Sequence, residues 1–369
     1  MDTIRALAVE IGPRPPCSPA EQRAAHWCAA QLGELGFEAE IEEFFSRPAY
    51  APWFVAYFAT AFVAALLVVP LPAAAVPLSL AAFVAYARDS EGDPLVRPRS
   101  GRSRNVIARP VGSTRPEAVV IAHMDSARSS PSFHPSVVGS FHSSVVALNL
   151  ALASVCVLAA AAWIAEAGRE LPAAMWVPAG AIAFYLAVVM SLLLYGHFRM
   201  PLVAGGNDNA SGVAVLMRLA RMDWGDRVWF VVTGSEEAGM IGARAFVDRY
   251  RDELDGARML NIDNVGAGRL IAVSAEGVLR ERRADKKMLA AAVAAGAEDE
   301  PFKGLPTDAT VLLRERIPAM TLLAVSDEGV PPNWHWPTDV MENVDPAALD
   351  RATAVARSVL GKIVLERAL

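Results

Sequence analysis

The sequence predicts an α/β protein: a three-layer α/β/α sandwich on a mixed, mostly parallel central sheet, with two inserted apolar helical hairpins. Three observations support this fold class. Strand-like and helix-like segments alternate through the polar parts of the chain, as in sheets covered by helices. Two long stretches are nearly free of charge, and 54% of the 369 residues are hydrophobic, a high share for a protein surrounded only by water.

The elements of the sandwich follow one another in an order that can be read from hydrophobic patterning. Strands are expected at 38–44, 104–110, 117–123, 227–232, 258–263, 269–276 and 319–325, and helices at 19–36, 210–222, 240–250, 284–296 and from 346 onward. The runs "AVVIA" and "VWFVV" are apolar at every position, which is typical of strands buried on both faces. Together these segments form one discontinuous domain made of residues 1–47, 88–135 and 198–369.

The two hairpins are predicted at 48–87 and 136–197. The first contains no charged residue and is broken in the middle by "PLP", while the second has apolar arms at 143–165 and 171–196. Each arm approaches the length needed to cross about 30 Å of hydrocarbon. We therefore expect about four transmembrane helices, with buried core helices as the alternative.

The charges that flank the hairpins predict the orientation in the membrane. The arginines lie on the side of the discontinuous domain: Arg47, Arg88, Arg97, Arg99, Arg102, Arg104 and Arg199. The loops that join the arms carry only Arg169, balanced by Glu166 and Glu170. The positive-inside rule then places the domain in the cytoplasm, with the hairpins in the plasma membrane. The start "MDTIRALAVE" lacks signal-peptide features, and Cys17, Cys28 and Cys156 are too few for a disulfide framework, which agrees with this placement.

Overall charge argues against one class of partner. The chain has 34 Lys and Arg against 40 Asp and Glu, giving a formal net charge of −6. A nucleic-acid-binding surface needs a positive excess. The expected partners are therefore a peptide substrate and the lipid bilayer.

Polar side chains gather where the predicted strands end. His123 and Asp125 follow one strand, Glu236 and Glu237 follow another, and Asp263 follows a third. The remaining candidates are Asp208, just before a helix, and His335, in the loop after strand 319–325. Ligands usually bind at the carboxyl ends of strands in such sheets. Two His, two Asp and one Glu suit a pair of zinc ions bound through nitrogen and oxygen, with one Glu to spare.

Each of these residues also has a simpler interpretation. Asp208 could cap a helix, and the Glu236–Glu237 pair could complement a helix dipole. The agreement of five separate positions favours metal binding over these readings. Divalent cations would offset the repulsion between the adjacent glutamates, so that one can bind metal while the other serves as a general base.

In this order the motifs resemble the co-catalytic di-zinc aminopeptidases, a family that includes leucyl aminopeptidases, aminopeptidase Y, glutamate carboxypeptidase and glutaminyl cyclases. The resemblance covers nearly all of the chain outside the hairpins, including "SRNVIARPVG" and "LPTDATVLLRERIPAMTLLA". It implies roles for the following residues: Asp208 as the bridge between two zinc ions, His123 and Asp263 on one ion, Glu237 and His335 on the other, Glu236 as catalytic base and Asp125 orienting His123. It also implies a cis peptide between Asp208 and Asn209.

The resemblance implies a zinc-dependent exopeptidase, with aminopeptidase activity preferred, and the two apolar hairpins predict that it is anchored in a membrane. A carboxypeptidase or N-acyl-amino-acid hydrolase would need a cation for the substrate carboxylate, for which Arg244, Arg269 and Arg314 are candidates. A glutaminyl cyclase would need only one metal. A catalytically inactive membrane scaffold is the alternative from outside the enzymes.

Overall fold

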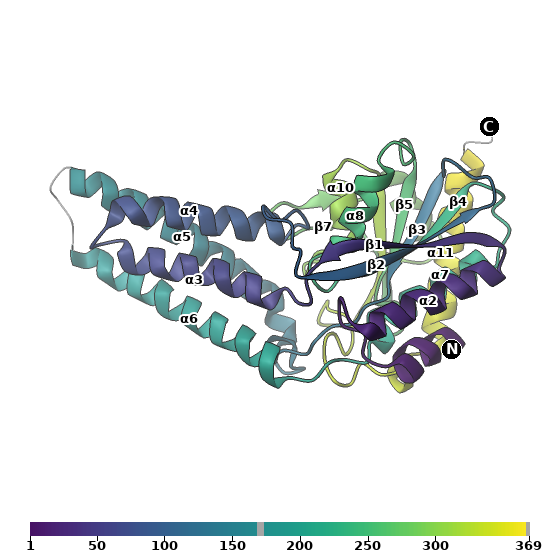
Figure 1. Ribbon diagram of the computed structural model, residues 1–369, viewed down its shortest axis with the longest axis horizontal. Coiled ribbons are helices and arrows are strands. Elements are labelled where there is room, and N and C mark those ends of the chain that lie inside the picture. The colour runs from purple at the N-terminus through teal and green to yellow at the C-terminus, as the bar shows by residue number, and fades with distance from the viewer. Residues whose placement is uncertain (168–172, 367–369) are drawn as a thin grey trace. The chain divides into compact units, whose positions relative to one another are not determined.

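The chain forms two compact units in the computed structural model, which describes residues 1–167 and 173–366 (Figure 1). The sheet unit comprises Met1–Ala49, Arg97–Ser129 and Pro201–Leu369, and the helical unit comprises Tyr50–Val96 and Ser130–Met200. The expected hairpin loop with Arg169 and Glu170 lies outside the described residues.

The sheet unit is built on eight strands in the order β1-β2-β4-β3-β5-β10-β6-β9. Their bounds are β1 Phe37–Ser46, β2 Gly101–Pro110, β3 Ala118–His123, β4 Val228–Thr233, β5 Arg258–Ile262, β6 Arg269–Val273, β9 Glu298–Glu300 and β10 Ala319–Val325. The central strands β4, β3, β5 and β10 run parallel, while β1, β2 and β6 pair antiparallel with a neighbour. The prediction of a mixed sheet in an α/β fold is confirmed.

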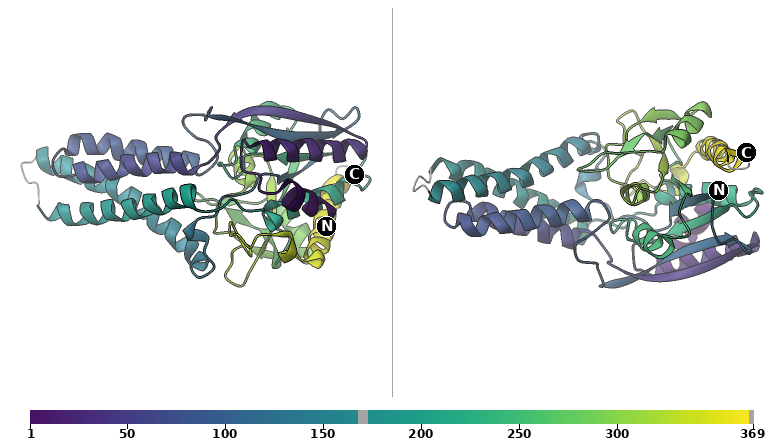
Figure 2. Two further views of the ribbon diagram at one scale, coloured as in Figure 1. Left: turned by 60° about the horizontal axis from the view of Figure 1, so that its bottom comes forward. Right: turned by 90° about the horizontal axis from the view of Figure 1, so that it is seen from above.

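Helices cover both faces of this sheet (Figures 1 and 2). One face packs against α2 Pro19–Glu34, α7 Gly212–Ala220, α9 Lys286–Ala294 and α11 Pro346–Glu366. The other face packs against α8 Ile241–Tyr250 and α10 Asp308–Arg314. Strand residues alternate between the two cores: Phe230 points into the first, whereas Trp229 and Val231 point into the second. Because both faces are buried, these strands carry apolar residues at successive positions.

Short elements complete the sheet unit. They are α1 Asp2–Ile4, the π-helix η1 Arg5–Ile11, the paired strands β7 Ala275–Glu276 and β8 Arg282–Arg283, the kinked segment η5 Gly206–Ser211, whose backbone is not helical at Asp208 and Asn209, and the 3₁₀ turn η6 Met341–Asn343. At one connection to the helical unit, the two chain segments pair with each other. Arg128 and Leu202 form an antiparallel bridge, and the Ser129 N–H donates to the Pro201 carbonyl at 3.0 Å. The Val203 N–H donates to the Ala127 carbonyl, also at 3.0 Å, so these six residues form a short stem.

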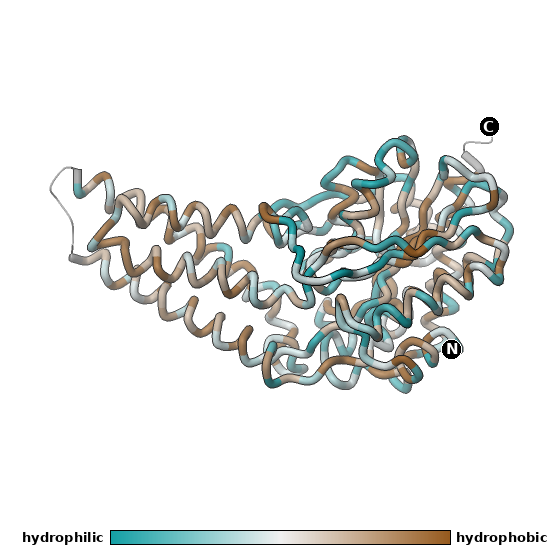
Figure 3. The backbone as a smooth tube through the Cα atoms, in the orientation of Figure 1, coloured by the Kyte–Doolittle hydropathy of each residue, from teal (hydrophilic) through white to brown (hydrophobic). Residues whose placement is uncertain are grey.

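Figure 3 shows how hydrophobic the residues of the helical unit are, and the described part of this unit consists mainly of four helices. They are α3 Ala51–Leu67, α4 Pro72–Asp89, α5 Phe141–Ala167 and α6 Trp176–Arg199, with the 3₁₀ turns η2 Pro131–Phe133, η3 Val138–Ser140 and η4 Ala173–Met175 beside them. Among the helices that the structure describes, only α5, with the turn before it, and α6 are both long and apolar enough to cross a membrane. Helix α3 has 17 residues, about 26 Å of helix, and α4 ends in the charged pair Arg88 and Asp89.

The exposed surface of the two long helices is strongly apolar. Only 22% and 17% of their most apolar windows are buried inside the protein. Ile164, Val177 and Phe184 are each more than 70% exposed. A core helix of a water-soluble protein would bury such side chains. The expectation of four clear spans is thus supported for two helices and not for α3 and α4.

Candidate metal centre

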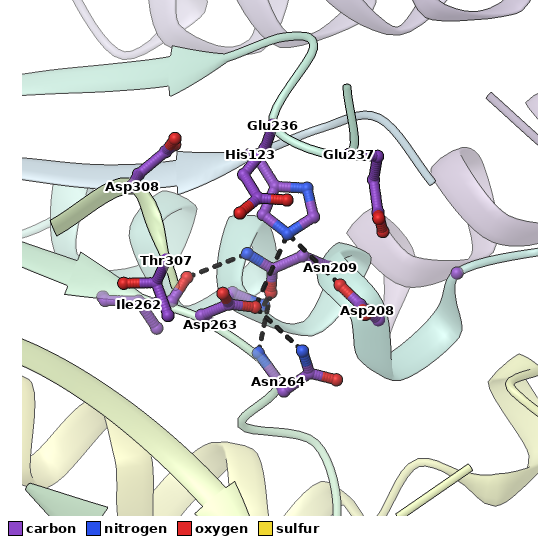
Figure 4. Close-up of polar contacts among 12 residues, drawn as sticks. His123, Asp208, Asn209, Glu236, Glu237, Ile262, Asp263, Asn264, Thr307 and Asp308 are labelled. Carbon is purple, nitrogen blue, oxygen red and sulfur yellow. Dashed lines mark hydrogen bonds and ion pairs between the residues drawn. The ribbon is translucent and has the colours of Figure 1, made fainter. Parts of the chain in front are cut away.

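The predicted ligands come together at the carboxyl ends of the parallel strands (Figure 4). His123 is the last residue of β3, and Asp263 directly follows β5. Glu237 lies four residues beyond β4, His335 lies in the loop after β10, and Asp208 lies within η5. The two histidines and two aspartates are at least 95% buried. Residues more than 200 positions apart in the chain therefore surround one point.

The ligands form two groups that share Asp208. Its Oδ1 atom lies 3.2 Å from His123 Nε2, which is also 3.5 Å from Asp263 Oδ1. Its Oδ2 atom lies 3.1 Å from His335 Nε2, which is 3.2 Å from Glu237 Oε2. In each group the candidate ligand atoms all lie within 4.8 Å of one another. A carboxylate that offers one oxygen to each of two such groups has the geometry of a bridging ligand.

The buried carboxylates of the cluster favour positive charge at its centre, as the pKa values of the two histidines indicate. Burial lowers the pKa of His123, but its hydrogen bonds with aspartates outweigh burial and raise the pKa well above the usual value. Burial likewise lowers the pKa of His335, but the charges of Glu237 and Asp208 and the hydrogen bonds with them outweigh burial and raise this pKa to about 10. Carboxylates crowded around two buried imidazoles thus stabilise cations at the positions of both rings. The Glu237 Oε1 atom is buried without a hydrogen-bond partner among the described residues, which also fits a metal ligand.

Glu236 belongs to neither group, although it is adjacent to Glu237 in the chain. Burial raises the pKa of Glu236 well above its usual value, against the opposing effect of His123. Figure 4 shows its carboxylate beside the His123 ring, on the side away from Asp208. A carboxyl group with a raised pKa at this place can both accept and return a proton.

The loop that carries both glutamates, residues 234–237, is called the base loop, and it is hydrogen-bonded to side chains from distant elements. Its four successive backbone N–H groups, from Gly234 to Glu237, all donate to side-chain oxygens. The Asp125 carboxylate accepts two of them, from Glu236 at 3.1 Å and Glu237 at 3.0 Å. Its other contact is with His123, whose Nδ1 lies 3.2 Å from the Asp125 carbonyl oxygen and 3.6 Å from the carboxylate. Asp125 therefore contacts both the imidazole and the base loop, and the second of these contacts was not predicted.

The segment around Asp208 is fixed by two buried residues that sequence reasoning missed. The Asp339 carboxylate accepts the N–H groups of Asn207 at 2.5 Å and Asp208 at 3.1 Å. The guanidinium of Arg14 is fully buried and donates to backbone carbonyls at Leu7, Gly12, Met124, Ala204 and Gly205. The peptide between Asp208 and Asn209 is cis, as the family resemblance implies. No local sequence signal distinguishes Arg14 or Asp339 from ordinary loop residues.

A further acidic residue, Asp308, lies close to the centre and was not assigned a role from the sequence. It begins α10, and its Oδ2 atom accepts a hydrogen bond from Thr233 Oγ1 at 2.6 Å. Its Oδ1 atom has no hydrogen-bond partner among the described residues. Burial raises the pKa of Asp308 to about 7. The motif "PTD" is also ordinary turn and helix-capping chemistry, which hid this residue in the sequence.

Two of the three arginines considered for binding a substrate carboxylate have acidic partners of their own. Arg244 pairs with Glu315 at 2.5 Å and with Asp248 at 2.9 Å. Arg269 pairs with Glu298 at 2.8 Å and Glu300 at 2.6 Å. The charge of both guanidinium groups is thus already compensated.

Comparison with known proteins agrees with this picture. Residues 190–360, which include Asp208, Glu236, Glu237, Asp263 and His335, match peptidase family M28. No curated protein sequence matches the chain.

The fold is shared with several solved structures, at sequence identities that establish likeness of fold alone. A zinc aminopeptidase from Bacillus subtilis superposes with a TM-score of 0.56 at 15% identity, over 97% of this chain and 92% of that one. A Zn-dependent exopeptidase from Parabacteroides distasonis gives 0.56 at 16% identity, over 97% of both chains. A glutaminyl cyclase from Porphyromonas gingivalis gives 0.53 at 15%, over 98% of this chain and 97% of that one.

Proposed function

Because residues 190–360 match peptidase family M28, we propose that the chain is a metallo-exopeptidase, and specifically a di-zinc aminopeptidase anchored in a membrane. The observation that carries the di-zinc part is the position of Asp208. Its two carboxylate oxygens face two separate groups, each with one His and one further carboxylate. A single-ion site would have no use for both groups, which argues against a glutaminyl cyclase of the one-metal kind.

The residues present fit two zinc ions in number and in chemistry. His123 and Asp263 would hold one ion, Glu237 and His335 would hold the other, and Asp208 would bridge them. Imidazole nitrogen and carboxylate oxygen are common zinc ligands. When bound, the ions polarise the scissile carbonyl and make water acidic enough to attack at neutral pH.

The chain's own contribution to the reaction centres on Glu236. Its carboxylate accepts a proton from the attacking water and later donates that proton to the nitrogen of the departing amine. A raised pKa favours this double role, since the group must bind the proton and release it within one turnover. Asp125 supports the geometry by holding the Glu236 backbone N–H and contacting the His123 ring.

The surroundings of the centre favour an amino terminus over a carboxyl terminus. Asp308 offers a buried carboxylate oxygen without a partner among the described residues, and Glu236 adds a second acidic group. A free α-ammonium group complements such acids. Arg244 and Arg269, by contrast, are already paired with acids and are poor anchors for a substrate carboxylate.

The membrane part of the proposal rests on the helical unit. Helices α5 and α6 expose large apolar side chains along most of their length. We place all four helices in the bilayer, with α3 and α4 completing the bundle, and the sheet unit on the cytoplasmic side of the plasma membrane. The arginines that flank the helices support this orientation, because positive charge is retained in the cytoplasm.

The test uses the full chain purified in detergent and a peptide panel offered with free and acetylated N-termini. We expect cleavage of free N-termini only, loss of cleavage with chelator, and two bound zinc ions per chain. Glu236→Gln should reduce kcat by at least about 100-fold while retaining both ions. Glu40→Gln is the matched control, because Glu40 is an exposed glutamate on β1. Cleavage of acetylated peptides would instead indicate an acyl-amino-acid hydrolase or carboxypeptidase, and failure to bind zinc would refute the proposal.

A further inference from the structure

Glu21 is a fully buried glutamate far from the metal ligands in sequence, in the first turn of α2. At this position of a helix, three residues after the N-cap Ser18, a glutamate commonly bonds back to the N-cap N–H. Here the Ser18 N–H donates to the Pro15 carbonyl instead, at 3.2 Å. The Glu21 side chain is therefore used for something other than capping its own helix.

The Glu21 carboxylate reaches the loop that carries the predicted base. Its Oε1 atom accepts the Ser235 N–H at 3.0 Å and the Ser103 hydroxyl at 2.6 Å. Its Oε2 atom accepts the Cys17 N–H at 2.8 Å. Ser235, which immediately precedes Glu236, has a φ of +53°, a conformation that non-glycine residues adopt only when their surroundings enforce it.

The contact between Glu21 and the base loop is close and leaves no space for adjustment. A Cβ atom added to Gly234 would lie 2.7 Å from Glu21 Oε1 and 2.5 Å from the Arg104 carbonyl oxygen. The loop can approach the carboxylate only because position 234 is glycine. The Asp125 carboxylate accepts the next two N–H groups along the loop, those of Glu236 and Glu237. Glu21 and Asp125 therefore accept hydrogen bonds from consecutive backbone N–H groups.

We propose that Glu21 is a positioning residue that fixes the backbone of Ser235 and thereby aims the Glu236 carboxylate at the substrate. The role rests on the proposed function, since it concerns the base of that reaction. The backbone N–H groups of Ser235 and Cys17 donate to different oxygens of Glu21. A backbone N–H can only donate a hydrogen bond, so each of them needs an acceptor. Glutamine has one acceptor oxygen, so Glu21→Gln must set its NH₂ group against one of these donors.

The chain contains a matched control in Glu276, which is also buried and also holds three groups. Its partners are the hydroxyls of Thr307, Thr310 and Thr321. A hydroxyl can accept as well as donate, so Glu276→Gln can be satisfied by rotation of these hydroxyls. Both variants remove one buried carboxylate, but only Glu21→Gln affects the base loop.

The experiment measures hydrogen exchange by mass spectrometry and steady-state kinetics on the full chain with two zinc ions bound. Glu21→Gln should increase exchange in the segment 234–237 by roughly 10- to 100-fold, the effect expected when a buried backbone N–H loses its hydrogen-bond partner. We expect kcat to fall by about 10- to 100-fold with KM within about twofold of wild type. Glu276→Gln should leave both the exchange of this segment and kcat near wild-type values. Zinc stoichiometry should remain two for both variants.

The outcomes separate this inference from the proposed function. If the wild type binds zinc and cleaves peptides, but Glu21→Gln matches Glu276→Gln in exchange and kcat, the positioning role is wrong and the proposed function stands. If the wild type is inactive, the proposed function fails, while faster exchange in Glu21→Gln alone would still show that Glu21 holds the loop. Should Glu21→Gln not fold, Ser103→Ala removes one donor from the same carboxylate and should raise exchange in 234–237 by a smaller factor. No change in that variant would then overturn the inference.

Discussion

Replacing Glu276 by glutamine should change how the stability of the sheet unit depends on pH. Glu276 is 2% exposed, and its carboxylate accepts hydrogen bonds from three threonine hydroxyls. Burial raises its pKa from the ordinary value of 4.5 to about 7, although the threonine hydroxyls oppose the shift. The folded protein therefore binds a proton at Glu276 more tightly than the unfolded chain does.

The sign and size of the effect follow from this difference. The stabilisation from protonated Glu276 is complete below about pH 4.5 and is lost as the pH rises through about 7. The gap between these two values corresponds to about 3 kcal/mol of unfolding free energy, at 1.36 kcal/mol per pKa unit. Glutamine at position 276 does not titrate, so the variant should gain about 3 kcal/mol relative to wild type between pH 4.5 and pH 7.5.

The assay is thermal unfolding of the zinc-free protein in detergent, at half-unit steps from pH 4.5 to 8. Every other titrating group is common to the two proteins, so the difference in Tm isolates Glu276. At about 2–4 °C per kcal/mol for a domain of 150–250 residues, the Tm of Glu276→Gln should rise by roughly 6–12 °C relative to that of wild type across this range. Parallel Tm profiles for the two proteins would refute the reasoning, because they would mean that Glu276 has the same pKa folded and unfolded.

Three further predictions concern the surroundings of the metal centre. Gly242→Ala would place a Cβ atom 2.1 Å from the Gly234 carbonyl oxygen, so it should cost about 1–3 kcal/mol in urea unfolding and lower kcat, and a wild-type midpoint would contradict this. Arg14→Lys keeps the positive charge but removes the guanidinium that donates to five backbone carbonyls, so the free energy of unfolding in urea should fall by about 3 kcal/mol or more. The control Arg280→Lys, at an exposed position, should leave it near the wild-type value. Chelator should lower Tm and zinc should restore it, with an unchanged Tm counting against metal binding in the folded state.

The fold could be predicted from the sequence where burial alone determines the pattern. Strand β10 was expected at 319–325 and is found at Ala319–Val325, because both of its faces are buried and all seven residues are nonpolar or small. Strands β1 and β2 are longer than expected, since antiparallel pairing continues over ten residues in each, through the charged Glu43 and Arg104. Strand order could not be predicted, because adjacency in the sheet depends on crossover connections.

The site divides along the same line. Metal-ligand candidates could be proposed from the sequence because they carry side chains that bind metal and stand beside predicted elements: Asp208 precedes a helix, and the others follow strands. The supporting residues could not be recognised, because their role is set by contacts across the fold: Glu21 bonds to Ser235 across 214 positions, and Asp339 bonds to Asn207 across 132. Asp339 and Glu21 each act on a backbone N–H group, which every non-proline residue carries, so the sequence holds no trace of the pairing.

The stem formed by residues 127–129 and 201–203 bears on how the helical unit and the sheet unit came to share one chain. Where the chain leaves the sheet unit after Ser129, it is already hydrogen-bonded to the segment by which it returns. Residues 130–200 are thus an insertion whose two ends are paired in the stem. In sequence this insertion lies between His123 and Asp208. A peptidase can thus gain, lengthen or lose such an insertion without displacing His123 or Asp208. On the proposed function, catalysis and membrane anchoring could then evolve separately, because residues 130–200 leave and re-enter the sheet unit at adjacent, hydrogen-bonded segments.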